Sequence, residues 1–239
     1  MSVMTEKTVR ELAVAMPAAT RVFESVGIDY CCGGNRTLEQ ACQAAHVPVD
    51  RVLDSLEAAD GTERATQKDW RTEPLADLID HIKSTHHKYV REEIARLGPL
   101  FDKVCSVHGK NHAELPRIRA TFGILAQELT THMMKEEMVL FPYIARMEEA
   151  VIEKAPVIPP PFGSVRNPVA MMVHEHDDAG QALHYMRQAT NSYTAPPDAC
   201  VSYQTLYKAL AEFEADLHQH IHLENNILFR RAIEMEQTA

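Results

Sequence analysis

The sequence predicts an all-α protein in which a small helical N-terminal domain precedes a four-helix bundle. Three observations lead to this prediction. Apolar residues recur at helical spacing from residue 73 almost to the end of the chain, a proline-rich segment divides that region once, and a pattern of histidine and glutamate occurs in both halves. We expect the small domain at residues 1–60, a linker at 61–72 and the bundle at 73–239.

Short helices are expected near the N-terminus. One is expected at about residues 6–15, and a second begins at Pro17, since proline suits the first turn of a helix. A third follows Thr37, whose TLEQ sequence matches a capping box. Between the last two lies the glycine-rich turn GIDYCCGGN. The polar stretch from Asp60 to Arg71, which contains the only tryptophan, is expected to connect this domain to the bundle.

Four long helices are predicted in the remainder of the chain. The segment 155–168, APVIPPPFGSVRNP, cannot be helical because of its prolines and serves as the central connection. Pro142 lies inside the second helix, where it removes one backbone hydrogen bond and is expected to kink the helix. The expected bounds are about 74–104, 115–150, 168–191 and 198–236.

The bundle region contains a duplicated metal-ligand pattern. The segment THMMKEEMVLF, with His132 and Glu136, recurs as QHIHLENNILF, with His220 and Glu224. In each copy the glutamate follows the histidine by four residues, so both side chains lie on one face of a helix. Leu-Phe then follows eight and nine residues after the histidine in both copies. Such spacing is typical of metal ligands.

Two further histidines complete the duplication. His87 precedes His132 by 45 residues, and His176 precedes His220 by 44. Each half of the bundle is therefore expected to bring a histidine and a His-x-x-x-Glu motif to a shared interior. Four imidazoles and two carboxylates around one cavity indicate a dinuclear metal site.

Neighbouring residues compete for these positions. Glu137 and Asn225 stand five residues after the two motif histidines, but only the four-residue spacing gives glutamate in both copies. The duplication also favours His87, His176 and His220 over adjacent histidines. The neighbours set aside on this ground are His86, His174, His218 and His222.

Three acidic residues are candidates for contacts behind the ligands. Glu128 and Asp216 stand four residues before His132 and His220, where a carboxylate can accept the second ring N–H of an imidazole. The alternative is an ordinary acidic residue on a solvated helix face. Glu175 is a further candidate cavity acid, with the same alternative.

The ligand types narrow the choice of metal. Imidazole with bridging carboxylate, and without thiolate, suits iron or manganese, and zinc can occupy the same site. Six ligands for two ions leave open positions, unlike the closed tetrahedron of structural zinc. We expect water, an oxo bridge, dioxygen or nitric oxide to fill those positions.

Cys31 and Cys32 lie in the Cys-Cys-Gly-Gly turn. Adjacent cysteines do not easily close a disulfide, so we expect reduced thiols and a cytoplasmic location. A turn of this kind can lower a thiol pKa, which favours a redox or metal-passing role; the alternative is a pair of small residues packed at a tight turn. The cysteines without partner spacing are assigned to packing: Cys42, Cys105 and Cys200.

Composition argues against several partners. The net charge is −10, and basic residues form no run, so nucleic acid and anionic membranes are not expected to bind. The N-terminus lacks the apolar core of a signal peptide, and no stretch has the roughly 18 apolar residues of a membrane span.

Motifs along nearly the whole chain resemble those of the Repair of Iron Centres family, di-iron proteins with a hemerythrin-like four-helix bundle and an added N-terminal domain. These motifs are DYCCGGNRTL, KDWR, THMMKEEMVLFP, HEHDDAG and HIHLENNILF. The resemblance implies two iron ions bridged by both glutamates and an oxo-type group. It assigns the ligands to the residues that the duplication selects: His87, His132, Glu136, His176, His220 and Glu224.

The function implied by the resemblance is the repair of iron–sulfur clusters damaged by nitric oxide or peroxide. The expected partners are damaged iron–sulfur proteins, with a homodimer formed through the N-terminal domain. We expect the site to supply iron, assisted by Cys31 and Cys32. Two alternatives use the same ligands: an enzyme that transforms nitric oxide or nitrite, and a module that senses nitric oxide or oxygen.

One position departs from the oxygen-carrying hemerythrins. They have a second histidine one turn after the ligand of the third helix, where this chain has Gly180. The missing side chain leaves room and coordination capacity. This difference favours labile iron, or attack by a small nitrogen oxide, over reversible oxygen storage.

Overall fold

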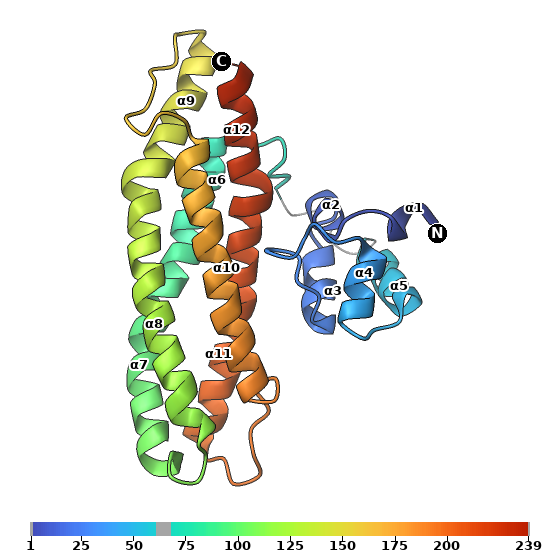
Figure 1. Ribbon diagram of the computed structural model, residues 1–239, viewed down its shortest axis with the longest axis vertical. Coiled ribbons are helices and arrows are strands. Elements are labelled where there is room, and N and C mark those ends of the chain that lie inside the picture. The colour runs from blue at the N-terminus through green and yellow to red at the C-terminus, as the bar shows by residue number, and fades with distance from the viewer. Residues whose placement is uncertain (1, 61–67, 239) are drawn as a thin grey trace.

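The computed structural model describes residues 2–60 and 68–238 (Figure 1). Within these residues all regular secondary structure is helical, apart from an isolated β-bridge between Thr8 and Thr37. The all-α prediction is confirmed. Residues 61–67, the first part of the predicted linker, lie outside the described residues.

The N-terminal unit is built from five short helices around its own apolar core. Capping boxes begin two of them, at Thr8 and at Thr37, the second as predicted. Phe23, Leu38 and Leu56 are fully buried in the core. Pro17 lies just before the helix that it was expected to begin. The five helices are α1 (Ser2–Thr5), α2 (Val9–Ala15), α3 (Ala19–Val26), α4 (Leu38–Ala44) and α5 (Val49–Asp60).

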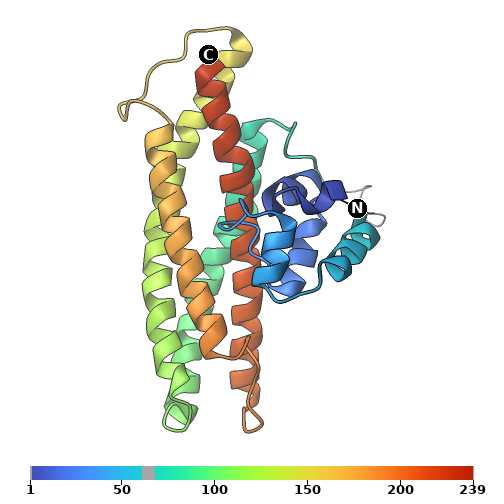
Figure 2. The same cartoon turned by 45° about the vertical axis from the view of Figure 1, so that its right-hand side comes forward.

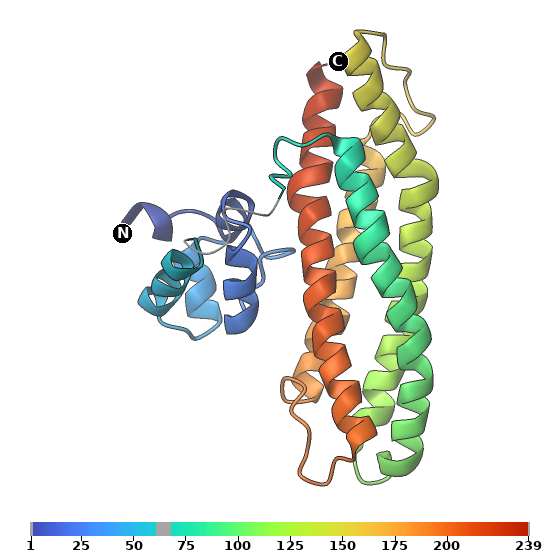
Figure 3. The ribbon, with the colours of Figure 1, turned by 180° about the vertical axis from the view of Figure 1, so that it is seen from behind.

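Four long helices form the bundle and run side by side for most of its length (Figures 1 and 3). Three of them are interrupted by a π-helical segment, labelled η. The first helix is α6 (Leu75–His81), η1 (Ile82–His87) and α7 (Lys88–His108); the second is α8 (Glu114–Lys135), η2 (Glu136–Leu140) and α9 (Phe141–Glu153); the third is α10 (Arg166–Ala189); and the fourth is α11 (Val201–His222), η3 (Leu223–Leu228) and α12 (Phe229–Thr238).

The π segments occur at one level of the bundle, beside the histidines and glutamates of the duplication. His87 ends η1, Glu136 begins η2, and Glu224 is the second residue of η3. In the second helix the departure from α geometry falls immediately before Pro142, the residue predicted to disturb it. Because proline has no N–H, the carbonyl of Met138 has no α-helical donor there.

The core of the bundle is divided into two apolar clusters. One contains residues such as Val90, Met133 and Ala179, and the other contains Ile82 and Met172. Along each helix the polar residues of the duplication fall between members of the two clusters. The fold therefore places a polar centre inside the bundle, enclosed above and below by apolar packing.

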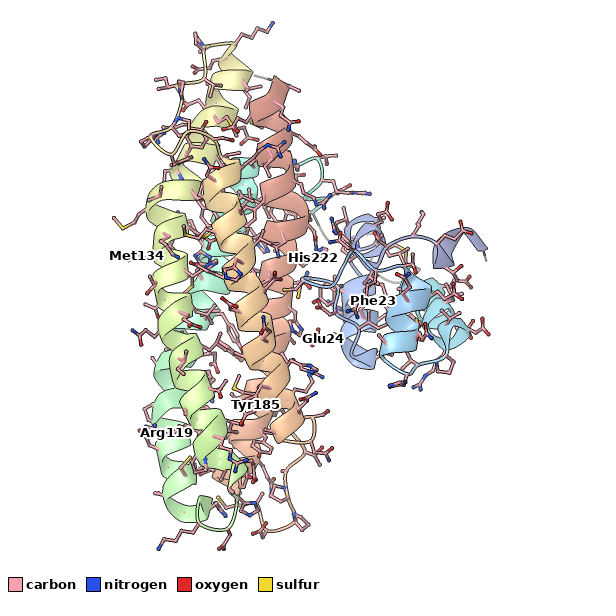
Figure 4. All side chains as sticks on the ribbon, in the orientation of Figure 1. Phe23, Glu24, Arg119, Met134, Tyr185 and His222 are labelled. Carbon is pink, nitrogen blue, oxygen red and sulfur yellow. The ribbon has the colours of Figure 1, made fainter. Side chains whose placement is uncertain are left out.

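The N-terminal unit packs against one side of the bundle (Figure 2). The amide of Asn226 donates to the backbone oxygen of Tyr30 at 3.1 Å, and the Tyr30 and His222 rings meet edge to face at 5.5 Å. Glu24 accepts hydrogen bonds from His218. Figure 4 labels Glu24 and His222 on the facing sides of the two parts.

The segment before the bundle is also fixed in place. Arg231 donates to the backbone oxygens of Trp70 and Glu73, at 2.8 and 2.6 Å. Arg71 pairs with Asp69 through two hydrogen bonds. The KDWR motif therefore anchors the entry of the chain against α12. Among the described helices, none is both long and apolar enough to cross a bilayer.

Candidate metal centre

All four helices of the bundle contribute to one buried polar centre. The six side chains predicted to bind metal are at most 3% exposed, and both glutamates are fully buried. They meet between the two apolar clusters. Their positions are His87 in η1, His132 in α8, Glu136 in η2, His176 in α10, His220 in α11 and Glu224 in η3.

The six residues form two groups of four. Two histidines in each group join both glutamates, and within each group one ligand atom per residue lies within 4.8 Å of the others. His87 and His220 belong to the first group, and His132 and His176 to the second. Glu136 and Glu224 are common to both, which is the arrangement that carboxylates bridging two ions require.

The Nε2 atoms of the histidines point into the centre. Those of His87 and His220 are 3.1 Å apart, and those of His132 and His176 are 3.0 Å apart. Glu136 Oε2 lies 3.4 Å from Nε2 of both His87 and His132. Each nitrogen pair therefore converges on a point where one cation can bind both rings.

The carboxylates make this centre strongly attractive to cations. Both oxygens of Glu136, and Oε2 of Glu224, are buried and have no hydrogen-bond partner among the described residues. A buried carboxylate without compensation is costly, so these oxygens need a metal ion or a proton nearby.

The raised pKa values of two of the histidines have the same cause, the negative charge of the buried carboxylates. Burial disfavours the charged imidazole, but Glu136 and Glu224 outweigh it and raise the pKa of His87 to about 10. For His132, burial lowers the pKa but the charge of Glu136 raises it by more, so that the pKa rises to about 9. Without metal, protons on these rings balance the carboxylates. The donor set of the centre therefore fits a dinuclear metal site.

The outer nitrogens of three ligand histidines are held by side chains from neighbouring helices. Nδ1 of His87 donates to Glu137 at 2.7 Å, Nδ1 of His132 to Glu175 at 2.8 Å, and Nδ1 of His176 to Asn225 at 2.9 Å. Because Nδ1 carries the proton, Nε2 of the neutral ring keeps its lone pair for a metal.

A positive side chain supports each of the two outer carboxylates. Arg91 donates to Glu137 at 2.7 Å, and Lys135 pairs with Glu175. Burial raises the pKa of both carboxylates, but the histidines and these cations outweigh it and lower the pKa below the usual value. Both acids therefore remain ionised as acceptors.

Two acidic residues lie elsewhere than expected. Glu128 is exposed, and no hydrogen bond in the described part of the chain joins it to His132. Asp216 contacts Nδ1 of His86 at 3.0 Å, not His220. Nδ1 of His220 has no hydrogen-bond partner among the described residues. Each acid lies on the same helix as the histidine four residues after it, but neither contacts the ring of that histidine.

Sequence reasoning did not identify Glu137 and Asn225 as outer partners. In the sequence these residues stand five positions after His132 and His220, where they compete with the ligand glutamates. In the structure each reaches across to a histidine of a different helix, His87 or His176. Because Glu137 and Asn225 occupy equivalent positions in the two copies, the duplication could have indicated that both contact the Nδ1 atom of a ligand histidine.

The histidines set aside in the sequence have other contacts. His174 is exposed, with 76% of its side chain accessible. His86 contacts Asp216, while His218 and His222 meet Glu24 and Tyr30 of the N-terminal unit. None of them is part of the two groups of four.

Three clefts reach the surroundings of the centre. One of about 950 Å³ is lined by Trp70, His86 and Glu137, and one of about 530 Å³ by Lys135 and Glu175. A third, of about 850 Å³, is lined by both cysteines of the glycine-rich turn. Small solutes can therefore approach the outer partners of the ligands from several sides.

Two family models match this chain. The hemerythrin HHE cation binding domain matches residues 77–232, and a domain of unknown function (DUF542) matches residues 5–60. The chain is also similar to proteins named iron–sulfur cluster repair protein YtfE. It is 37% identical to that of Musicola paradisiaca (strain Ech703), over 97% of this chain and 98% of the relative. It is 38% identical to that of Citrobacter koseri, over 93% and 94%. The chain belongs to the Repair of Iron Centres family.

The family assignment predicted from the motifs is thus confirmed. The bundle of this Repair of Iron Centres protein is a hemerythrin-type cation-binding domain, and its buried histidines and glutamates fit a metal site. The match at residues 5–60 covers helices α2 to α5 of the N-terminal unit.

In this Repair of Iron Centres protein, the cysteine turn lies against the metal centre. The thiol of Cys32 lies 3.6 Å from the backbone oxygen of His176. A Cβ atom added to Gly180 would lie 3.5 Å from the same sulfur. Cys32 therefore occupies the space that a larger side chain at position 180 would fill.

Asp29 shapes this turn. Its carboxylate accepts the backbone N–H groups of Cys31, Cys32 and Gly33, at 3.0, 2.9 and 2.8 Å. The two sulfurs lie 3.8 Å apart as free thiols. The hydrogen bond with Cys32 and burial raise the pKa of Cys31, so the lowered thiol pKa expected from the sequence is wrong for Cys31, which is a neutral thiol at rest.

Proposed function

We propose that this protein restores damaged iron–sulfur clusters by supplying iron from a dinuclear centre. The observation that carries the proposal is the sharing of Glu136 and Glu224 between two histidine pairs. Two carboxylates that reach both groups suit two neighbouring ions, and imidazole with carboxylate suits iron. The relatives' name, iron–sulfur cluster repair protein, supports the same function.

The proposed ligands are His87, His220 and both glutamates for one iron, and His132, His176 and both glutamates for the other. Six protein ligands leave each ion with open positions. When bound, the irons supply sites for water, an oxo bridge or nitric oxide, and manganese or zinc can replace them. Glu137, Glu175 and Asn225 orient the histidines.

We further propose that Cys31 and Cys32 assist the release of iron, which is here the cargo. Their sulfurs are 3.8 Å apart, and Cys32 contacts the backbone of His176. Because the pKa of Cys31 is raised, its proton must leave before its sulfur can bind iron. The clients would be damaged iron–sulfur proteins in the cytoplasm, and a homodimer through the N-terminal unit would be the working form.

A second candidate function is the transformation of nitric oxide or nitrite at the same centre. It is favoured by the open positions and by the clefts beside Glu137 and Glu175. A donor loses iron to the client in proportion to the clusters restored, whereas an enzyme turns over many substrate molecules with its iron retained.

The first test is the metal content of protein purified from iron-replete cells, with its visible absorption for oxo-to-iron charge transfer. We expect about two irons per chain. The loaded protein is then mixed with an iron–sulfur protein damaged by nitric oxide, and iron in both proteins is measured. Stoichiometric movement of iron to the damaged protein supports iron donation. Retention of iron while nitric oxide or nitrite is consumed supports the enzyme. Zinc alone after anaerobic iron reconstitution would contradict both.

The role of the thiols is tested in the same assay. Cys31→Ala/Cys32→Ala is compared with Cys200→Ala, which removes an exposed cysteine. We expect slower iron transfer only in the first variant, with unchanged iron content. Equal transfer in the three proteins would remove the thiol step from the proposal.

A further inference from the structure

The far end of the bundle holds a second cluster of metal-type side chains. His108 is the last residue of α7, His112 lies in the turn before α8, and Asp198 lies in the connection before α11. One atom from each residue, a ring nitrogen or a carboxylate oxygen, lies within 4.8 Å of the others. The 21 residues of α7 separate this cluster from the centre by about 30 Å.

The cluster has the donors of a cation site. Nε2 of His112 lies 3.0 Å from Oδ2 of Asp198, a separation that two ligands of one ion can adopt. Nε2 of His108 is buried and has no hydrogen-bond partner among the described residues. A buried ring nitrogen without a partner is costly, and a metal ion would satisfy it.

The rings of this cluster are also oriented from behind. Glu114 lies with Oε1 3.3 Å from Nδ1 of His112, and it accepts a hydrogen bond from the hydroxyl of Tyr203 at 2.9 Å. The fully buried Tyr203 ring packs against both imidazoles, with centroid distances of 5.2 Å to His108 and 5.4 Å to His112. A carboxylate on Nδ1 leaves Nε2 for a metal, as Glu137 does for His87.

We infer that His108, His112 and Asp198 bind one divalent transition-metal ion, for which zinc is the best-suited common choice. Two imidazoles and one carboxylate provide three protein ligands for zinc, and water completes the tetrahedron. The ion would join the α7–α8 turn to the α10–α11 connection. The site is separate from the iron centre and does not depend on the proposed repair function.

The same residues have a simpler explanation as an ion pair. Hydrogen bonding to Asp198 raises the pKa of His112, and hydrogen bonding to His112 lowers the pKa of Asp198. Such a pair also holds the two connections together. It does not give His108 Nε2 a partner, and only the metal site predicts binding of zinc that requires both histidines.

Zinc binding to the iron-loaded protein tests the inference. The protein is dialysed against micromolar zinc chloride, and zinc and iron are measured by mass spectrometry. We expect wild type to take up about one more zinc per chain than His108→Ala/His112→Ala, with the same iron in both. His174→Ala is the matched control, because it removes a surface histidine with an aspartate four residues away.

Two further variants make the result decisive. Asp198→Ala alters an exposed side chain and keeps both histidines, and it should also lose the extra zinc. Glu114→Gln should bind zinc about 10- to 100-fold more weakly. The inference is wrong if wild type takes up no extra zinc, or if the double variant and Asp198→Ala bind as much as His174→Ala.

Discussion

Cys32 and His176 are in direct contact, with the thiol sulfur 3.6 Å from the histidine's backbone oxygen. A residue of the N-terminal unit thus touches the helix turn that holds a proposed iron ligand. Gly180 lies beside this contact, which gives the thiols a position next to the metal centre.

Removing a shared carboxylate should affect both irons. We expect Glu136→Gln to lower iron content from about two per chain to below one, since the neutral amide cannot bridge two cations. Glu128→Gln changes an exposed acid on the same helix and serves as the control. Iron content is measured after identical reconstitution. Full loading of Glu136→Gln would exclude the bridging role.

Removing an outer partner should weaken binding by a smaller amount. Glu137→Gln removes the charge behind His87, and we expect about 10- to 100-fold weaker iron binding. Glu92→Gln, in an exposed pair with Lys88, is the control. Affinity is measured by competition with a chelator. If the two variants compete equally well, Glu137 has no influence on the metal.

Asn226 should determine how closely the N-terminal unit is held. Its amide donates to Tyr30, and Asn226→Ala leaves that carbonyl without its donor, at a cost of about 1–3 kcal/mol. We expect faster reaction of Cys31 with a thiol reagent. Asn111→Ala, in the turn after α7, leaves the docking contacts intact and is the control. An unchanged rate would show that other contacts hold the unit.

Gly180 should accept one methyl group but not a large side chain. A Cβ there would meet Cys32 at an ordinary contact distance of 3.5 Å. Because Gly180 lies inside α10, Gly180→Ala should stabilise the protein by up to about 1 kcal/mol. Gly180→His should displace the cysteine turn and increase thiol reactivity. Thermal unfolding and thiol labelling measure the two effects; a destabilised alanine variant would contradict the prediction.

The π segment of the first helix can be tested by deletion. Ser84 is an exposed residue of η1, and its removal would let the segment return to α geometry. One residue corresponds to a rotation of about 100°, so either His87 or α6 would leave its packed position. We expect loss of iron or a marked loss of stability, whereas Ser84→Ala should retain both.

Much of the fold could be predicted because helical periodicity and proline positions are local signals. The four bundle helices lie close to their expected bounds, and the duplication selected the six residues that meet at the centre. The contacts behind the ligands were harder to predict. Glu137 serves a histidine of another helix, so its role depends on helix rotation and on a π segment, which sequence spacing alone does not reveal.

The π segments also affect how the helices can move against each other. Along α10, which has none, buried residues keep a regular alternation of three- and four-residue steps: Val169, Met172, His176, Ala179, Leu183 and Met186. In the first helix the adjacent buried residues His86 and His87 follow Ile82 by four and five residues, and this breaks the alternation within η1. Apolar packing therefore lies on both sides of the metal level in this helix, with Ile82 in one cluster before it and Val90 in the other cluster after it. Packing on both sides of the centre therefore sets the level at which its ligands meet.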